Sequence, residues 1–186
     1  KNLFRDYIKD RDCITPEPDR VWEYYNQKCS LAQAFDIAIN NEGLREISDP
    51  KIYMNKHELV GGYKTVEEIK AVTGKDKVLV FQPFGRTAEN MGDFVIDGTS
   101  RSFHLNDVIR ICKELREDYA VIIMSEFPVV VEENPKFPVA VPQIPDVRVW
   151  SSVIEIADHF LGCDSLGQHM AKALGTTCTS VIGSTD

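Results

Sequence analysis

The amino-acid sequence predicts an α/β fold in which a parallel sheet is covered by helices on both faces. From residue 77 onward, short apolar runs alternate with segments whose apolar residues recur at helical spacing. The apolar runs have the length of strands and contain few polar residues, which is typical of strands buried on both faces. Strands that alternate with helices through short connections pair in parallel, because each crossover returns the chain to the same edge of the sheet.

Two helices are predicted ahead of this regular part. The first covers 31–38, because a serine precedes it as a cap and apolar residues follow at helical intervals. The second covers 66–72, with Thr65 as its cap and Gly74 after its end. Aromatic and charged residues are mixed irregularly around both helices, so we expect residues 1–74 to form a linker and the remnant of another region.

Further strands and helices are predicted in the rest of the chain. The strands, in chain order, are 78–81, 120–124, 147–150, 159–162 and 177–182. The helices are 105–115, 151–157 and 165–174, each marked by a recurring apolar face or by a serine that can cap it. Glycine and polar residues predict a loop at 82–102, and prolines predict another at 125–146, with an edge strand at most.

Composition and charge exclude several classes of function. The 186 residues carry a formal net charge of −8, and an acidic surface argues against broad contact with nucleic acid or anionic lipid. No apolar run approaches the roughly 20 residues that a transmembrane helix needs, and no signal peptide is recognisable. The apolar surroundings of Cys112, Cys163 and Cys178 predict buried, reduced thiols in a cytoplasmic protein. We therefore expect no metal, no cofactor, no nucleic-acid partner and no transmembrane segment.

Two places qualify as a ligand site, because parallel sheets bind ligands beyond the carboxyl ends of their strands. They are the loop after the first strand and the turn that joins 159–162 to the helix 165–174. The start of that helix attracts anions, Ser165 and His169 share one of its faces, and Gly167 leaves space for a ligand. In the alternative interpretation, a polar residue of the turn merely caps the helix and His169 is an ordinary surface group.

The segment Gly162–Gly183 resembles the donor-site signature of glycosyltransferase family 9, the heptosyltransferases. That family has D-[ST]-G-x-x-H followed by A-x-A-L-G, a short strand and F-G-x-T. The matching positions of this chain are Asp164, Ser165, His169, Ala171, Ala173, Leu174, Gly175, Gly183 and Thr185. Leu166 stands where the family usually has glycine, and Gly167 follows one place late.

Three upstream elements resemble other parts of the same family. Arg101-Ser102-Phe103 resembles its basic-x-aromatic element ahead of a helix, and 82–85 resembles the glycine-containing loop after the first strand of the domain. The segment 152–158 resembles the helix that precedes the signature. The resemblance thus extends over about residues 77–186.

The resemblance implies the GT-B fold, in which two Rossmann-like domains face a cleft. Residues 75–186 would be the donor-binding half, cut short at its C-terminal end, and residues 1–74 the linker and a remnant of the acceptor side. Such enzymes transfer a sugar with inversion and without a required metal, from a nucleotide-diphosphate sugar such as ADP-heptose to a glycan or lipopolysaccharide-type acceptor. The chain begins at Lys1 rather than Met, so we expect a fragment.

The resemblance also assigns roles to residues. Those implicated in binding the donor or its phosphates are Arg101, Asp164, Ser165, Leu166, Gly167, His169, Gly85 and Arg86. Arg101 would neutralise the diphosphate leaving group, because the fork of a guanidinium matches phosphate oxygens. Glu126 could meet a ribose hydroxyl. The catalytic base would lie on the acceptor domain, so we expect this chain alone to bind donor weakly and to transfer nothing.

Two other functions stay open. Ser165 lies in a strand–turn–helix, as the nucleophile of a serine hydrolase does, although Cys163 stands where G-x-S-x-G requires glycine. The candidate base His169 also lies on the same helix, whereas a triad histidine comes from a later loop. The other alternative is a non-catalytic sugar-nucleotide-binding or scaffolding module of the same fold, which the departure at Leu166 favours.

Overall fold

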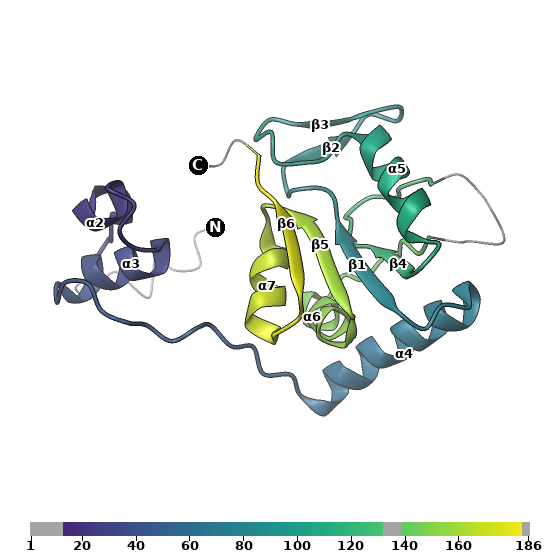
Figure 1. Ribbon diagram of the computed structural model, residues 1–186, viewed down its shortest axis with the longest axis horizontal. Coiled ribbons are helices and arrows are strands. Elements are labelled where there is room, and N and C mark those ends of the chain that lie inside the picture. The colour runs from purple at the N-terminus through teal and green to yellow at the C-terminus, as the bar shows by residue number, and fades with distance from the viewer. Residues whose placement is uncertain (1–12, 132–138, 184–186) are drawn as a thin grey trace. The chain divides into compact units, whose positions relative to one another are not determined.

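The computed structural model describes residues 13–131 and 139–183. The chain divides into two compact units, Lys1–Asp49 and Pro50–Asp186. The smaller unit contains η1 (Pro18–Arg20), α2 (Trp22–Tyr25) and α3 (Leu31–Asn40) (Figure 1). Ser30 caps α3 through reciprocal hydrogen bonds with Gln33, which confirms the predicted helix and its cap.

The larger unit is built on a four-stranded sheet in the order β4-β1-β5-β6, and every pair of neighbours is parallel. Its strands are β1 (Val78–Gln82), β4 (Ala120–Ile123), β5 (His159–Cys163) and β6 (Cys178–Val181). Its helices are α4 (Lys56–Thr73), α5 (Leu105–Leu115), α6 (Val147–Ile156) and α7 (Leu166–Leu174). The predicted α/β fold, a parallel sheet flanked by helices, is confirmed.

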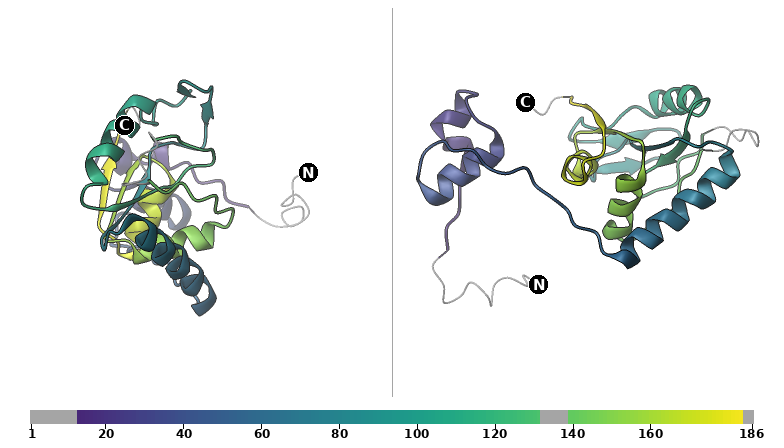
Figure 2. Two further views of the ribbon diagram at one scale, coloured as in Figure 1. Left: turned by 90° about the vertical axis from the view of Figure 1, so that its right-hand side faces the viewer. Right: turned by 60° about the horizontal axis from the view of Figure 1, so that its bottom comes forward.

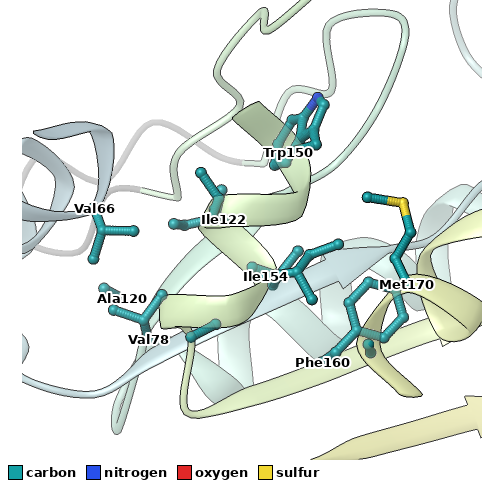
Figure 3. Packing of buried hydrophobic residues seen from close by; sticks show 12 residues of the cluster. Val66, Val78, Ala120, Ile122, Trp150, Ile154, Phe160 and Met170 are labelled. Atoms are coloured by element: carbon teal, nitrogen blue, oxygen red, sulfur yellow. The ribbon is translucent and has the colours of Figure 1, made fainter. Parts of the chain in front are cut away.

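Alternate residues of the strands point into two separate apolar layers. Val78 and Val80 belong to the layer formed with α4, α6 and α7, where Ile154 and Met170 pack together with Phe160 of β5 (Figure 3). Leu79 and Phe81 belong to the opposite layer, which α5 covers. Figure 2 shows the sheet between α5 on one side and α4 with α6 on the other. This burial on both faces explains why the strands read as continuous apolar runs.

The predicted strand at 147–150 is wrong, because these residues form the first turns of α6. The sequence Val-Arg-Val-Trp alternates like a strand, but the Asp146 carboxylate accepts a hydrogen bond from the N–H of Arg148 at 2.8 Å and starts a helix there. The indole of Trp150 then packs inward and donates to the carbonyl of Ile144 at 3.1 Å. The helix predicted from residue 151 therefore exists but begins four residues earlier.

The second predicted helix is also longer than expected. α4 begins after Asn55, whose side chain forms a capping box with Glu58, and it ends at Gly74 in the left-handed conformation. Thr65 lies in the middle of α4 and is not a cap; its hydroxyl donates to the carbonyl of Gly61. α4 precedes residue 75, the predicted start of the donor domain, yet packs against α6 within the larger unit (Figure 2).

The loop and cysteine predictions need two corrections. The predicted loop 82–102 contains an antiparallel hairpin, β2 (Ala88–Asn90) and β3 (Val95–Asp97). The loop 125–146, of which 132–138 lie outside the described residues, contributes a single bridge residue, Ala140, to the edge of the sheet. Cys112 and Cys163 are buried as predicted, but Cys178 is exposed because β6 is an edge strand.

The close contact between α4 and α6 depends on a glycine. A Cβ placed at Gly62 would lie 2.7 Å from Cβ of Ser152 and 2.9 Å from its carbonyl carbon, so the two helix backbones leave no room for a side chain. The neighbouring Gly61 has its nearest contact, with Val149, at 3.9 Å. An ion pair between Arg148 and Glu58, with N–O distances of 2.8 Å, joins the same two helices.

This contact generates a prediction with a control one residue away. Gly62→Ala should destabilise the larger unit by about 1–3 kcal/mol, because the helices must separate to admit the methyl group. Gly61→Ala should be neutral or stabilising, since alanine favours a helix over glycine by up to about 1 kcal/mol. Urea denaturation of both variants measures the difference, and equal stabilities would show that α4 and α6 are not packed this closely.

Candidate functional site

A pocket of about 740 Å³ opens at the carboxyl ends of β1 and β4. This is the size of a small-molecule site. The central strand β1 lies between β4 and β5, and the chain crosses from β1 to β4 on one side while β5 and β6 follow on the other. Ligands of open parallel sheets bind at such a reversal of strand order. The walls come from the loops after β1 and β4 and from the first residues of α6 and α7.

The pocket combines an apolar wall with two opposite charges. Phe84 and Phe127 stack in a tilted arrangement with their ring centroids 5.0 Å apart, and Trp150 lies on the α6 side. Arg86 and Glu126 are exposed and line the same pocket. A flat organic group would find apolar surface here, while a phosphate would find a cation and a hydroxyl group would find a carboxylate.

The turn that begins α7 is held by the side chain of Gln82, the last residue of β1. The Oε1 atom of Gln82 accepts a hydrogen bond from the N–H of Gly167 at 2.9 Å, and its Nε2 atom donates to Oγ of Ser165 at 3.3 Å. Ser165 makes no capping bond of its own. Gln82 therefore supplies the cap that the alternative interpretation gave to a polar residue of the turn.

The space expected at Gly167 is occupied by the protein itself. Gly167 is buried, and a Cβ placed there would collide with Oε1 of Gln82 and would lie 2.7 Å from Cε2 of Phe160. The glycine is thus required for packing against the sheet and does not open the turn to a ligand. Its N–H, one of the groups expected to face a phosphate, is already bonded to Gln82.

A second glutamine joins the turn to the edge strand. Gln168 donates from Nε2 to the carboxylate of Asp164 and accepts from the hydroxyl of Ser180 in β6. Gln82 and Gln168 together connect the residues around Ser165 to the strands on either side of β5. The turn is therefore bonded to the sheet on both sides of β5.

The loop after β1 is organised by Asp97, which the sequence analysis did not single out. One carboxylate oxygen accepts from the hydroxyls of Thr87 and Thr99, both at 2.7 Å, and the other accepts from the hydroxyl of Ser102 at 2.6 Å. Ser102 in turn accepts from the N–H of Gly85 at 2.9 Å. Burial opposes ionisation of Asp97, but these hydrogen bonds together hold its pKa well below the usual range.

A signal for Asp97 was present in the sequence. Asp-Gly-Thr is a common turn sequence, in which the aspartate side chain accepts from a backbone N–H two residues later. The N–H of Thr99 donates to Asp97 at 2.9 Å in this way. No comparable local signal marks Gln82, whose partners in the turn before α7 lie more than 80 residues away.

The structure separates the predicted site residues into two groups. Gly85, Arg86, Ser165 and Leu166 line the pocket. The other four lie outside its walls: Arg101, Asp164, Gly167 and His169.

Arg101 donates from Nε to the hydroxyl of Thr99 at 3.2 Å. Burial raises the pKa of Cys163, the last residue of β5, to about 11. His169 is exposed on α7.

The environment of Ser165 bears on the serine hydrolase alternative. Its hydroxyl oxygen accepts from the Gln82 amide, and an amide cannot take a proton as a general base does.

Among the residues that the structure describes, no group of three His, Cys, Asp or Glu side chains could hold a metal ion. Within the same residues, no helix is long and apolar enough to cross a membrane.

The fold and the position of the pocket define a class of α/β proteins with a Rossmann-like sheet and a pocket at its carboxyl edge. Among solved structures, the chain is similar to the ADP-heptose LPS heptosyltransferase II of E. coli, with a TM-score of 0.51 and 12% sequence identity. The match covers 81% of this chain and 46% of that chain, so this chain spans less than half of the enzyme's length. No protein-family model and no curated protein matches the chain.

The similarity to the heptosyltransferase confirms the predicted fold class, a Rossmann-like parallel sheet flanked by helices. At 12% identity the likeness concerns the fold, and it does not carry the enzyme's substrates or chemistry over to this chain. The functional conclusion therefore has to come from the pocket.

Replacing Asp97 tests whether its carboxylate stabilises the loop after β1. Asp97→Asn removes one of the two acceptor oxygens, so we expect a loss of about 1–3 kcal/mol at pH 7 in urea denaturation. Because the pKa of Asp97 is lowered on folding, its contribution is present above the ordinary value of 3.8 and disappears as pH falls through the lower folded value. The deficit should therefore narrow below about pH 4.

Asp93→Asn serves as the control, because Asp93 is an exposed residue of the same hairpin. The stability of Asp93→Asn should match that of the wild type at pH 7 and at pH 3. An Asp97→Asn deficit that stays constant between pH 7 and pH 3 would contradict the hydrogen-bonded carboxylate as its cause.

Proposed function

We propose that this chain is the donor-binding half of a glycosyltransferase and that its pocket binds a nucleotide-diphosphate sugar. The observation that carries the proposal is the pocket at the carboxyl ends of β1 and β4, where Arg86 and Ser165 line one cavity together with aromatic side chains. The GT-B type fold supports the same assignment. The acceptor would be a glycan or a lipopolysaccharide-type molecule.

Each part of the pocket suits one part of such a donor. The guanidinium of Arg86 suits the diphosphate, and the hydroxyl of Ser165 offers a hydrogen bond to the same group. The carboxylate of Glu126 suits a ribose hydroxyl, and the aromatic wall around Phe84 and Phe127 suits the base. The predicted role of Arg101 in neutralising the leaving group stays a prediction, since Arg101 lies outside the pocket.

The catalytic base is assigned to an acceptor domain and not to this chain. We therefore expect the chain by itself to bind a donor weakly and to release no nucleotide from it. A longer protein that also supplies the acceptor domain should transfer the sugar with inversion.

The binding test uses isothermal titration calorimetry with ADP-heptose, ADP-glucose and UDP-glucose. At least one donor should bind, and Arg86→Ala should weaken it roughly tenfold or more, because a charge-assisted hydrogen bond contributes about 1.5–3 kcal/mol. Arg110→Ala is the matched control, because Arg110 is an exposed arginine of α5 that pairs with Asp107. That variant should bind like the wild type.

The outcomes separate the alternatives. Binding by this chain together with nucleotide release by the longer protein supports the transferase. Binding without release in the longer protein supports the non-catalytic module, for which Leu166 in place of the family's glycine is the motivating observation. If none of the three donors binds at millimolar concentration, the proposed function is wrong.

A further inference from the structure

The side chain of Gln82 joins the end of β1 to both the loop after β1 and the start of α7. It is only 8% exposed and lines the pocket. Besides its contacts with Gly167 and Ser165, its Nε2 atom donates to the carbonyl of Phe84 at 3.3 Å.

The orientation of the Gln82 amide is fixed by its two backbone partners. The N–H of Gly167 can only donate, so it must face the oxygen Oε1, and the carbonyl of Phe84 can only accept, so it must face the nitrogen Nε2. A flipped amide would place two donors together and two acceptors together. The assignment of oxygen and nitrogen therefore follows from chemistry.

This orientation determines what Ser165 can do. Because Nε2 of Gln82 has only protons to offer, the oxygen of Ser165 must be the acceptor in their hydrogen bond. The hydroxyl proton of Ser165 must then point away from Gln82, and Ser165 lines the pocket. The hydroxyl is thus set as a donor toward a hydrogen-bond acceptor bound there.

The neutrality of Gln82 matters as much as its orientation. The first N–H groups of a helix have no partner within the helix and carry a partial positive charge. Gln82 occupies the N–H of Gly167 without bringing a negative charge to this end of α7. A glutamate could accept the same hydrogen bond but would repel a phosphate and could not donate to Ser165 while ionised.

We infer that Gln82 is a positioning residue, which orients the Ser165 hydroxyl as a hydrogen-bond donor to a ligand phosphate and caps α7 without adding a negative charge. The inference rests on the proposed function, because it assumes an anionic ligand in the pocket. It adds a residue that the donor-site signature does not contain.

The first experiment examines the hydrogen bond without ligand. The N–H of Gly167 has no acceptor within α7, so the rate at which this N–H exchanges its hydrogen tests the bond to Gln82. Gln82→Met, which keeps the length and loses the amide, should accelerate exchange at Gly167 on the order of tenfold. Thermal unfolding of the same variant establishes that it is folded. Unchanged exchange at Gly167 in a folded variant would overturn the inference.

The second experiment measures the binding of ADP to the wild type and to four variants by calorimetry. Gln82→Met and Ser165→Ala should each weaken the binding of ADP roughly tenfold. The double variant should bind ADP no more weakly than Ser165→Ala alone, because both changes remove the same hydrogen-bond donor. Gln82→Glu, which keeps the shape, should weaken ADP further, and added salt should reduce that extra loss. Losses that multiply in the double variant would overturn the inference.

The two proposals fail in distinguishable ways. If the wild type binds ADP and Gln82→Met binds it equally well, the positioning role is wrong and the donor pocket stands. If the wild type binds neither ADP nor any donor sugar nucleotide, the proposed function is wrong, and the ligand-directed role of Gln82 is wrong with it.

Discussion

The strand β1 imposes the constraint on which the rest of the larger unit depends, because all five of its residues are buried. A strand without an exposed position needs a partner on each edge and an apolar layer on each face. The strands β4 and β5 supply the partners, while α5 covers one face and α4, α6 and α7 cover the other. Parallel neighbours also end at the same edge, so the burial of β1 creates the crevice in which the pocket lies.

Gln82 is the last residue of the buried strand β1 and lines the pocket. Its backbone still pairs with Gly162 in the sheet, while its side chain binds the turn before α7. A primary amide can meet a donor and an acceptor at once without a charge, so it is buried without an unpaired group. The site is therefore attached to the rigid end of the core, and the position of Ser165 is settled by the sheet and not by a free loop.

Sequence periodicity predicted the sheet because burial on both faces leaves a pattern that needs no knowledge of partners. The same pattern misled at 147–150, where the deciding facts are the cap at Asp146 and the contact of Trp150 with Ile144, and the latter exists only in the folded chain. For the site, the rule that parallel strands end at the same edge was enough to predict that the loop after β1 and the turn before α7 lie together. Both line the pocket, through Gly85, Arg86, Ser165 and Leu166. Gln82 was missed because its bonds to the α7 turn join residues far apart in the sequence, and a sequence pattern carries no trace of such a pair.

The glycine of the turn stands at 167, one place later than in the signature that this segment resembles, and the packing explains why. The position that cannot hold a side chain in this chain is 167, since Phe160 and Gln82 fill the space around it. Position 166 faces outward, and the side chain of Leu166 is 52% exposed at the pocket. A glycine at 166 would leave the backbone open to close approach, whereas leucine covers it. With glycine at 167, the backbone of the turn packs closely against the core and not against a ligand. An anion in the pocket would therefore contact the Ser165 hydroxyl before it contacts the backbone of α7.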